Sequence, residues 1–497
     1  MAPPPVSGTT TPQHGQLLTT PPTLVTTVST ADLLGLLGVD PLGQQLLTLA
    51  YSPLCTVNVY ALNYETVGAK SEATTSTGAL MVPSGSASGC QGARPIVEYA
   101  HGTSPLKSFD VAQLSGADAS SEGLILAAVF AAAGYIVVAP NYAGYDRSTL
   151  SYHPYLVAAQ QADEMMDVLT AARSALPVTL APTVTDNHQL FVTGYSQGGY
   201  VAMAAIRAMQ TASQTVTAAA PLSGPYALAA FGDALFYGEV NASATENVAL
   251  LANGYQNAYG NLYSAPTDVF ALPYANDIAG LLPSTTPIST LYSENQLPAA
   301  ALFSSSPPAA QYASITPATS PSALAGVFAA GFAASGYLTL NSYRLAYLQD
   351  AAANPDGGFP TATTGLPPVS PANALRQDLK TNDLRNWTPT MATLLCGGAE
   401  DPDVFFFNTQ LMQAYWAAEA PGAPVTVLDV ASAPTAGDPY TTEKDGFTAA
   451  VAAIEAAAIA GGSTDGGHAA VLAKYHATLV APFCLVAARV FFDGQGG

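Results

Sequence analysis

The first half of the chain alternates between short apolar runs and longer stretches in which apolar residues recur at helical spacing. The apolar runs, which predict strands, lie at residues 95–100, 135–139, 189–193 and 216–222. The helical stretches lie at residues 122–133, 155–176 and 197–209. The predicted strands are apolar throughout instead of at every second position. That pattern indicates an α/β protein with a mostly parallel sheet covered by helices on both faces.

Two more strands are predicted upstream, at residues 57–64 and 75–82, because both segments are rich in Val, Thr and Tyr. Residues 1–23 are polar and rich in Pro and Thr, so we expect them to form an extended or disordered tail. The first part of the folded core is therefore predicted to span residues 24–225.

The alternation stops at residue 226 and resumes near residue 386. Beyond that point the pattern predicts strands at 390–397 and 424–430 and helices at 407–418 and 481–492. We therefore predict one core, 24–225 and 386–497, interrupted by an insertion at 226–385. Insertions of this size in sheet enzymes usually lie over the site, so we expect a mainly helical lid or cap. A separate domain packed away from the site is the alternative.

The strongest chemical signal is at residues 194–198, which read Gly-Tyr-Ser-Gln-Gly. They fit the G-x-S-x-G pattern, in which a serine nucleophile sits on a tight turn from a strand into a helix. A predicted strand comes directly before the motif and a predicted helix directly after it, and a chance match would rarely have both. The sequence therefore predicts that Ser196 is a catalytic nucleophile.

Attack by a serine also needs backbone N–H groups that stabilise the developing oxyanion. The residue after the nucleophile, Gln197, normally supplies one of them. The other comes from the loop after an earlier strand, and residues 101–103 (His-Gly-Thr) occupy that place. We therefore predict an oxyanion hole formed by Thr103 and Gln197; an ordinary turn at residues 101–103 is the alternative.

The acid and the base of a catalytic triad should follow the serine in this order. Residues 399–404 (Ala-Glu-Asp-Pro-Asp-Val) follow the predicted strand 390–397, and we favour Asp401 as the acid, with Asp403 and Glu400 as alternatives. Two histidines lie downstream. We favour His476, which we place on the loop leading into the last helix, over His468 in a predicted flexible loop.

The composition narrows the range of partners. Charged residues make up only 9% of the chain, and the formal net charge is −21. Nucleic acid is therefore a poor partner for this chain, since phosphate binding needs clustered cations. Apolar residues make up 49% of the chain, but the runs at 124–133 and 449–461 are too short or interrupted to span a membrane. We predict two buried helices there and no transmembrane segment.

Four cysteines, an even number, suit two disulfides in an oxidising compartment. Of the three possible pairings we favour Cys55–Cys90 with Cys396–Cys484; four buried free thiols are the alternative. No C-x-x-C motif occurs, which argues against structural zinc. Residues 1–5 do not resemble the start of a signal peptide, so we expect a mature secreted or periplasmic protein with an added start Met; a cytoplasmic protein is the alternative.

These motifs resemble those of bacterial secreted α/β-hydrolases of the secretory lipase and esterase group. The supporting segments are residues 99–103, 141–146, 153–156, 194–199 and 482–484. The resemblance implies a Ser–Asp–His triad, ester hydrolysis, no metal or other cofactor, and a helical lid. The chain departs from the commonest pattern in its acid loop, which carries three carboxylates, and in its two C-terminal histidines. His153, which precedes the serine, is expected to be a structural hydrogen-bonding group.

We therefore expect a carboxylic ester hydrolase that forms an acyl-enzyme on Ser196. A serine peptidase or an acyltransferase with the same triad, and a binding module without catalysis, are the rivals. The composition is compatible with small, lipid, aromatic or polymeric ester substrates. We expect a monomer, with an acyl pocket that is mostly apolar and has few charges near the bound ester.

Overall fold

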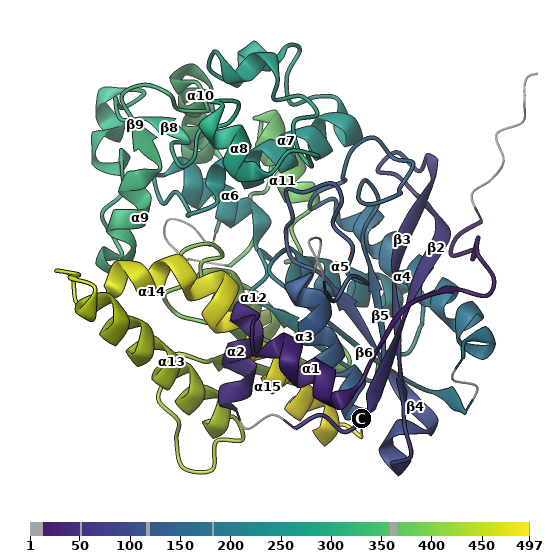
Figure 1. The fold of residues 1–497 in the computed structure, drawn as a ribbon. Coiled ribbons are helices and arrows are strands. Elements are labelled where there is room, and N and C mark those ends of the chain that lie inside the picture. Colours follow the sequence, from purple (N-terminus) through teal and green to yellow (C-terminus); the bar gives the residue numbers. More distant parts are fainter. Residues whose placement is uncertain (1–12, 50–51, 116–119, 181–182, 358–364, 497) are drawn as a thin grey trace, which may run out of the picture.

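The computed structural model describes residues 13–49, 52–115, 120–180, 183–357 and 365–496. A nine-stranded sheet runs through it in the order β1-β2-β3-β5-β4-β6-β7-β10-β11 (Figure 1). The strands are β1 (Thr23–Val28), β2 (Thr56–Val67), β3 (Ala73–Ser84), β4 (Gly92–Ala100), β5 (Ile136–Pro140), β6 (Val184–Tyr195), β7 (Ala218–Leu222), β10 (Ala392–Gly397) and β11 (Val425–Asp429). In this order, all neighbours from β5 to β11 pair in parallel. The pairs β1–β2, β2–β3 and β3–β5 are antiparallel. The predicted mostly parallel sheet is confirmed.

Both faces of the sheet are covered by apolar side chains. Neighbouring residues in a strand point to opposite faces, and Ile96 and Val97 of β4 accordingly belong to two different apolar clusters. The first cluster contains α4 (Ala158–Ala175) and α5 (Gln197–Thr211). The second contains α3 (Ser121–Val129) and α15 (Ala481–Gly494). This two-sided burial explains why the strands read as continuous apolar runs.

The N-terminal segment is more ordered than the sequence indicated. Residues 1–12 lie outside the described residues, but residues 13–22 follow the edge of β2, where Leu18 N–H donates to the carbonyl oxygen of Asn63 at 2.8 Å. Strand β1 and the helices α1 (Thr30–Leu37) and α2 (Pro41–Thr48) were not predicted. Helix α2 packs against α3 and α15, so part of the N-terminal segment belongs to the core.

The insertion 226–385 forms a layer above the sheet in the view of Figure 1. Its helices are α6 (Leu228–Phe236), α7 (Ala244–Tyr259), α8 (Ile288–Ser293), α9 (Ala325–Ala330), α10 (Asn341–Ala353) and α11 (Ala374–Thr381), with two short strands, β8 (Phe303–Ser304) and β9 (Phe332–Ala333). Arg376 on α11 links three helices of this layer, because its buried guanidinium binds Asp233 on α6 and Asp350 on α10, each at 2.8 Å. We call residues 226–385 the cap.

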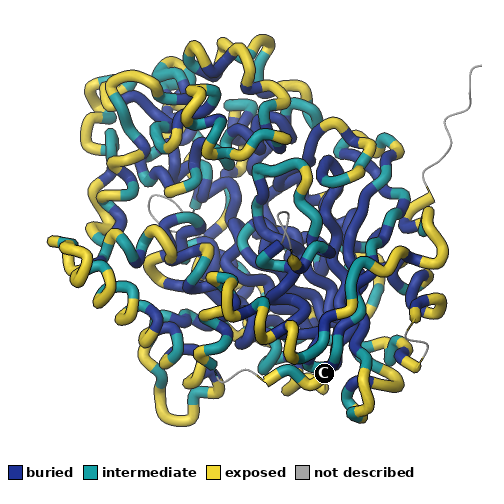
Figure 2. Tube along the Cα trace, in the orientation of Figure 1, coloured by how far each residue is buried: buried dark blue, intermediate teal, exposed yellow. Residues whose placement is uncertain are grey.

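The C-terminal part forms four helices, and one of them, α13, differs from expectation in its burial. They are α12 (Phe407–Glu419), α13 (Thr441–Ala460), α14 (His468–Lys474) and α15, with a π-helical segment, Tyr475–Val480, between α14 and α15. A buried helix was predicted at residues 449–461, and the prediction of burial is wrong. These residues form the end of α13, where only Ala450 is buried. Figure 2 shows α13 exposed along its outer side. A run of alanines is apolar enough to suggest burial but small enough to be tolerated in solvent.

Residues 468–494 together make one apolar helix long enough to cross a membrane by length and composition. Two thirds (67%) of its most apolar window is buried inside the protein, as in the core helix of a folded domain. This long helix was not predicted from the sequence, because His468 was assigned to a loop and residues 481–492 to a separate helix.

The two predicted disulfides, Cys55–Cys90 and Cys396–Cys484, are both present. The second lies close to the candidate catalytic residues, since Cys396 precedes Asp401 by five positions and Cys484 follows His476 by eight. It therefore links the end of β10 to α15, the two elements on either side of the candidate site.

We expect the double substitution Cys396→Ala/Cys484→Ala to lower the free energy of unfolding by about 2–5 kcal/mol, as measured by urea denaturation. The matched control is Cys55→Ala/Cys90→Ala. Its bridge spans 35 residues instead of 88, so its removal releases less unfolded-state entropy and should cost less. A larger cost for the shorter bridge would contradict this explanation.

Candidate active site

Ser196 sits on the turn that joins β6 to α5. Its φ is 60° and its ψ is −123°, a conformation that is strained for a residue with a side chain. Gly198 leaves no room for a side chain, because a Cβ there would overlap the carbonyl oxygen of Ala100. The glycines of the G-x-S-x-G motif therefore allow β4 and α5 to approach closely behind the serine.

The structure brings Ser196, His476 and Asp401 into one hydrogen-bonded chain. His476 Nδ1 lies 2.7 Å from Asp401 Oδ2, and His476 Nε2 lies 2.8 Å from Ser196 Oγ. A carboxylate can only accept, so Nδ1 carries the proton and Nε2 is left to accept from the serine hydroxyl. This is the arrangement in which a histidine removes a proton from a serine.

His476 lies in the π-helical segment before α15, not on a loop as the sequence suggested. Its backbone carbonyl accepts a hydrogen bond of 2.6 Å from the Tyr195 hydroxyl, which adds a second anchor to the segment. Burial lowers the pKa of His476, but the charge of Asp401 and its hydrogen bond raise it more, so the pKa lies above its usual value. An imidazolium at this position would thereby be stabilised.

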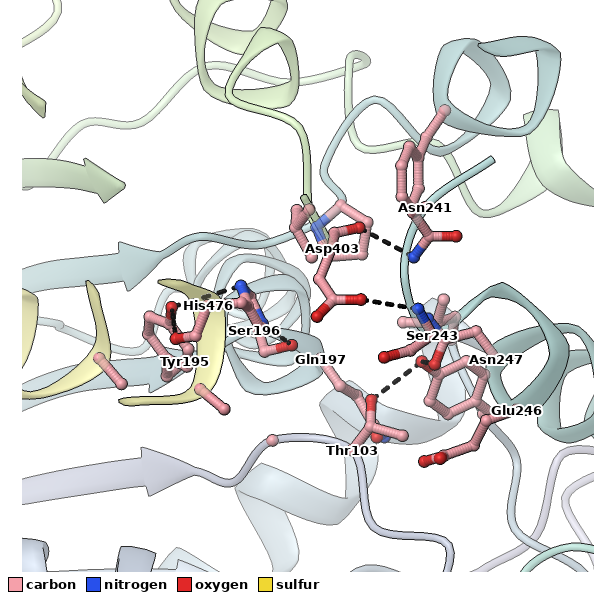
Figure 3. A pocket seen from close by; sticks show the side chains of 18 of the residues that line it. Thr103, Tyr195, Ser196, Gln197, Asn241, Ser243, Glu246, Asn247, Asp403 and His476 are labelled. Atoms are coloured by element: carbon pink, nitrogen blue, oxygen red, sulfur yellow. Dashed lines mark hydrogen bonds between the residues drawn. The ribbon is translucent and has the colours of Figure 1, made fainter. Parts of the chain in front are cut away.

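The three carboxylates of the acid loop have different surroundings. Asp401 is buried, and its second oxygen accepts the N–H groups of Asp403 at 2.9 Å and Val404 at 3.0 Å. Asp403 turns toward the cap, where its side chain accepts the N–H of Ser243 at 2.9 Å (Figure 3). Glu400 is exposed. Only Asp401 contacts His476 among the three.

The other histidines named above lie elsewhere. His468 begins α14, and its Nε2 lies 3.0 Å from the carbonyl oxygen of Ala323 in the cap, so it is neither in a loop nor beside Ser196. His153 is buried and hydrogen-bonds Ala143 O through Nδ1 at 3.0 Å, and Gln197 Nε2 lies 2.8 Å from its other nitrogen. Burial lowers the pKa of His153 to about 3, so it is a neutral structural group, as expected.

Thr103 and Gln197 lie on the wall of the same cavity as Ser196. Gln197 is the first residue of α5, where the N–H groups of a helix have no partner within the helix. The Thr103 hydroxyl lies 2.9 Å from the hydroxyl of Tyr155. The loop before Thr103 is held by a residue that the sequence did not reveal: Glu122 on α3 accepts the N–H of Gly102 at 3.0 Å.

A cavity of about 360 Å³ opens above Ser196, between the core and the cap. The cap supplies much of its apolar wall, with Leu228, Phe231, Leu235, Val248, Leu251 and Leu379. Three carboxylate residues also line it: Glu122, Glu246 and Asp403. The wall is thus mostly apolar, as expected, but α7 and the acid loop each bring a carboxylate that no local pattern assigns to the cavity.

Within the described part of the chain, no group of three His, Cys, Asp or Glu side chains could hold a metal ion. The chemistry that the site can perform with its own residues is proton transfer between Ser196 and His476 and attack by the serine oxygen on a carbonyl carbon.

Comparison with known proteins agrees with this geometry. Residues 125–262 match the sequence model of the prolyl oligopeptidase family, a stretch that includes Ser196 but ends before Asp401 and His476. No curated protein sequence matches the chain. A rice cell wall degrading esterase, LipA from Xanthomonas oryzae, is 26% identical over 84% of this chain and 91% of its own, with a TM-score of 0.63.

Two further solved structures extend the likeness over nearly the whole chain. A ligand-bound form of LipA covers 97% of this chain and 100% of its own, at 24% identity and a TM-score of 0.68. A protein from Legionella pneumophila covers 96% of this chain and 98% of its own, at 18% identity and a TM-score of 0.63. The cap is thus included in these alignments. The 26% identical esterase and the partial family match, together with the sheet and the serine turn, identify the chain as an enzyme of the serine hydrolase superfamily with an α/β-hydrolase fold, similar to bacterial esterases.

Proposed function

We propose that the chain is a carboxylic ester hydrolase that works through an acyl-enzyme on Ser196, with His476 as base and Asp401 as acid. The observation that carries this proposal is the hydrogen-bonded chain Asp401–His476–Ser196, at 2.7 and 2.8 Å, at the floor of a cavity. The similarity to a bacterial esterase supports the ester as substrate.

In the first half of the reaction, the Ser196 oxygen attacks the carbonyl carbon of the ester while His476 Nε2 takes the serine proton. Asp401 holds the imidazole in the required tautomer and stabilises its charged form. The backbone N–H groups of Thr103 and Gln197 stabilise the oxyanion. The C–O bond to the alcohol then breaks as His476 returns the proton to the leaving oxygen.

In the second half, water replaces the alcohol. His476 removes a proton from this water, the hydroxide attacks the acyl carbon, and the bond to Ser196 breaks as the serine oxygen regains a proton from His476. The products are the carboxylic acid and the free enzyme. No external cofactor is required for either half.

The roles within the acid loop can be separated by three conservative substitutions. We expect Asp401→Asn to lower kcat/KM for a small ester by about 10⁴-fold, because the imidazole loses its tautomer control. Asp403→Asn keeps an acceptor for Ser243 and should cost about tenfold or less. Glu400→Gln, the matched surface control, should stay within about twofold of wild type. A larger loss in Asp403→Asn than in Asp401→Asn would move the acid role to Asp403.

The cap is proposed to set the length of acyl or alcohol chain that fits. Leu251 on α7 lines the cavity, so Leu251→Ala should enlarge it and raise the kcat/KM ratio of long-chain to short-chain esters by roughly threefold to tenfold. Leu272→Ala removes an exposed leucine of the same cap and serves as the control. Identical chain-length profiles for the two variants would contradict a role of the cap in substrate choice.

A peptidase is the second candidate, favoured by the match of residues 125–262 to the prolyl oligopeptidase family. One experiment decides between the two: kcat/KM for short and long acyl esters, compared with peptide anilides, after active-site titration with a fluorophosphonate. We expect labelling at Ser196 and faster turnover of the esters. Anilide turnover as fast as ester turnover would favour the peptidase, and no labelling would contradict both.

We also propose a secreted or periplasmic location. Two disulfides, one of them next to the candidate site, form and persist in oxidising compartments. The similarity to a cell wall degrading esterase supports this location, since its substrate is outside the cell.

A further inference from the structure

The cavity above Ser196 has an uneven distribution of charge. Glu122, Glu246 and Asp403 line it, and among the described residues that line it there is no Lys or Arg. Elsewhere in the cap, buried carboxylates such as Asp233 are paired with buried arginines. The cavity carboxylates have no such arginine partner, and the cationic group near Glu122 and Asp403 is His476 in its protonated form.

Glu246 differs from the other two carboxylates of the cavity in its hydrogen bonding, since Glu122 and Asp403 both accept hydrogen bonds. It lies in the first turn of α7, on the cap side of the cavity (Figure 3), and in the described part of the chain no hydrogen bond or ion pair joins its side chain to another residue. Burial raises the pKa of Glu246 to about 7, and the charge of Asp403 contributes in the same direction. Burial also raises the pKa of Asp403. A cation between Glu246 and Asp403 would stabilise the charged form of both carboxylates and lower both pKa values.

Aromatic rings complete these surroundings. Tyr155 and Phe231 line the same cavity, and the Tyr155 hydroxyl lies 3.3 Å from Oδ1 of Asn247, the neighbour of Glu246. Aromatic faces next to carboxylates are the environment that favours ammonium groups, which interact with both.

We propose that the cavity binds esters that carry an ammonium group, with Glu246 and Asp403 as its counter-charges. This inference rests on the proposed ester hydrolysis at Ser196 and names the substrate class. Attraction between an ammonium and a carboxylate is stronger beside a partly buried carboxylate than in bulk water. The formal net charge of −21 would also draw cationic substrates toward the protein.

The test uses two pairs of esters that have the same shape and differ in one charge. Acetylcholine and 3,3-dimethylbutyl acetate differ on the alcohol side. Ethyl 4-(trimethylammonio)butanoate and ethyl 5,5-dimethylhexanoate differ on the acyl side. We expect kcat/KM of the wild type to favour the cationic ester by roughly tenfold in at least one pair at low salt. The preference should decrease as salt is added, since salt screens the attraction.

Glu246→Gln should lower this preference by roughly threefold to tenfold, whereas Glu239→Gln, which removes a charge from the same cap outside the cavity, should leave it unchanged. A measurement on the wild type alone gives the same information: tetramethylammonium chloride should inhibit hydrolysis of the neutral ester more than sodium chloride at equal ionic strength. Turnover of the neutral esters with no preference in either pair would overturn the inference and leave the proposed function standing. No turnover of any of the four esters would overturn both.

Discussion

Ser196→Ala should lower kcat/KM for ester substrates by about 10⁶-fold, because the only group able to form the acyl-enzyme is then missing. The substituted turn keeps its glycines, so the fold and the thermal transition should stay close to those of the wild type. The measurement is initial-rate hydrolysis of a p-nitrophenyl ester, together with labelling by a fluorophosphonate.

Two controls make this result specific. Ser223→Ala removes another buried serine hydroxyl, next to β7 and outside the hydrogen-bonded chain, and should keep most of the activity. Labelling should disappear in Ser196→Ala and persist in Ser223→Ala. Ester turnover near the wild-type rate in the Ser196 variant would contradict the central proposal.

His476→Ala is expected to have an effect of similar size, about 10⁶-fold in kcat, since the serine loses its base. His468→Ala is the matched control, because the His468 ring contacts the cap backbone at Ala323 and not Ser196. It should cost less than about tenfold, or roughly 1.4 kcal/mol of barrier. The opposite ranking would move the base to His468 and would require a rearrangement of α14.

The pH profile gives a second readout of His476. The base must be neutral to accept the serine proton, and the pKa of His476 is raised above its usual value. Activity should therefore fall as the pH decreases through a value above the ordinary histidine pKa of about 6.5. Asp403→Asn removes one of the charges that raise this pKa, so the acid limb should shift to lower pH. An acid limb that stays in place would contradict the assigned charge coupling.

The sequence by itself determined the features that depend on local hydrogen bonding and local spacing. A strand, a G-x-S-x-G turn and a helix follow one another within 30 residues, so the position of Ser196 at the end of a parallel strand could be predicted. The continuous apolar strands indicated the parallel sheet covered on both faces. The apolar or helical pattern is a property of each segment and is visible before the packing is known.

The tertiary structure decided what depends on residues far apart in the chain. Three carboxylates within four positions look alike in sequence, and only the approach of His476, 75 residues downstream, distinguishes Asp401 from Asp403 and Glu400. The exposure of α13 and the order of residues 13–22 also depend on which surfaces remain free after the core has packed. Likewise, the folding of the cap over the sheet brings Glu246 of α7 to the cavity, because a side chain becomes part of a site through long-range contacts that local pattern does not encode.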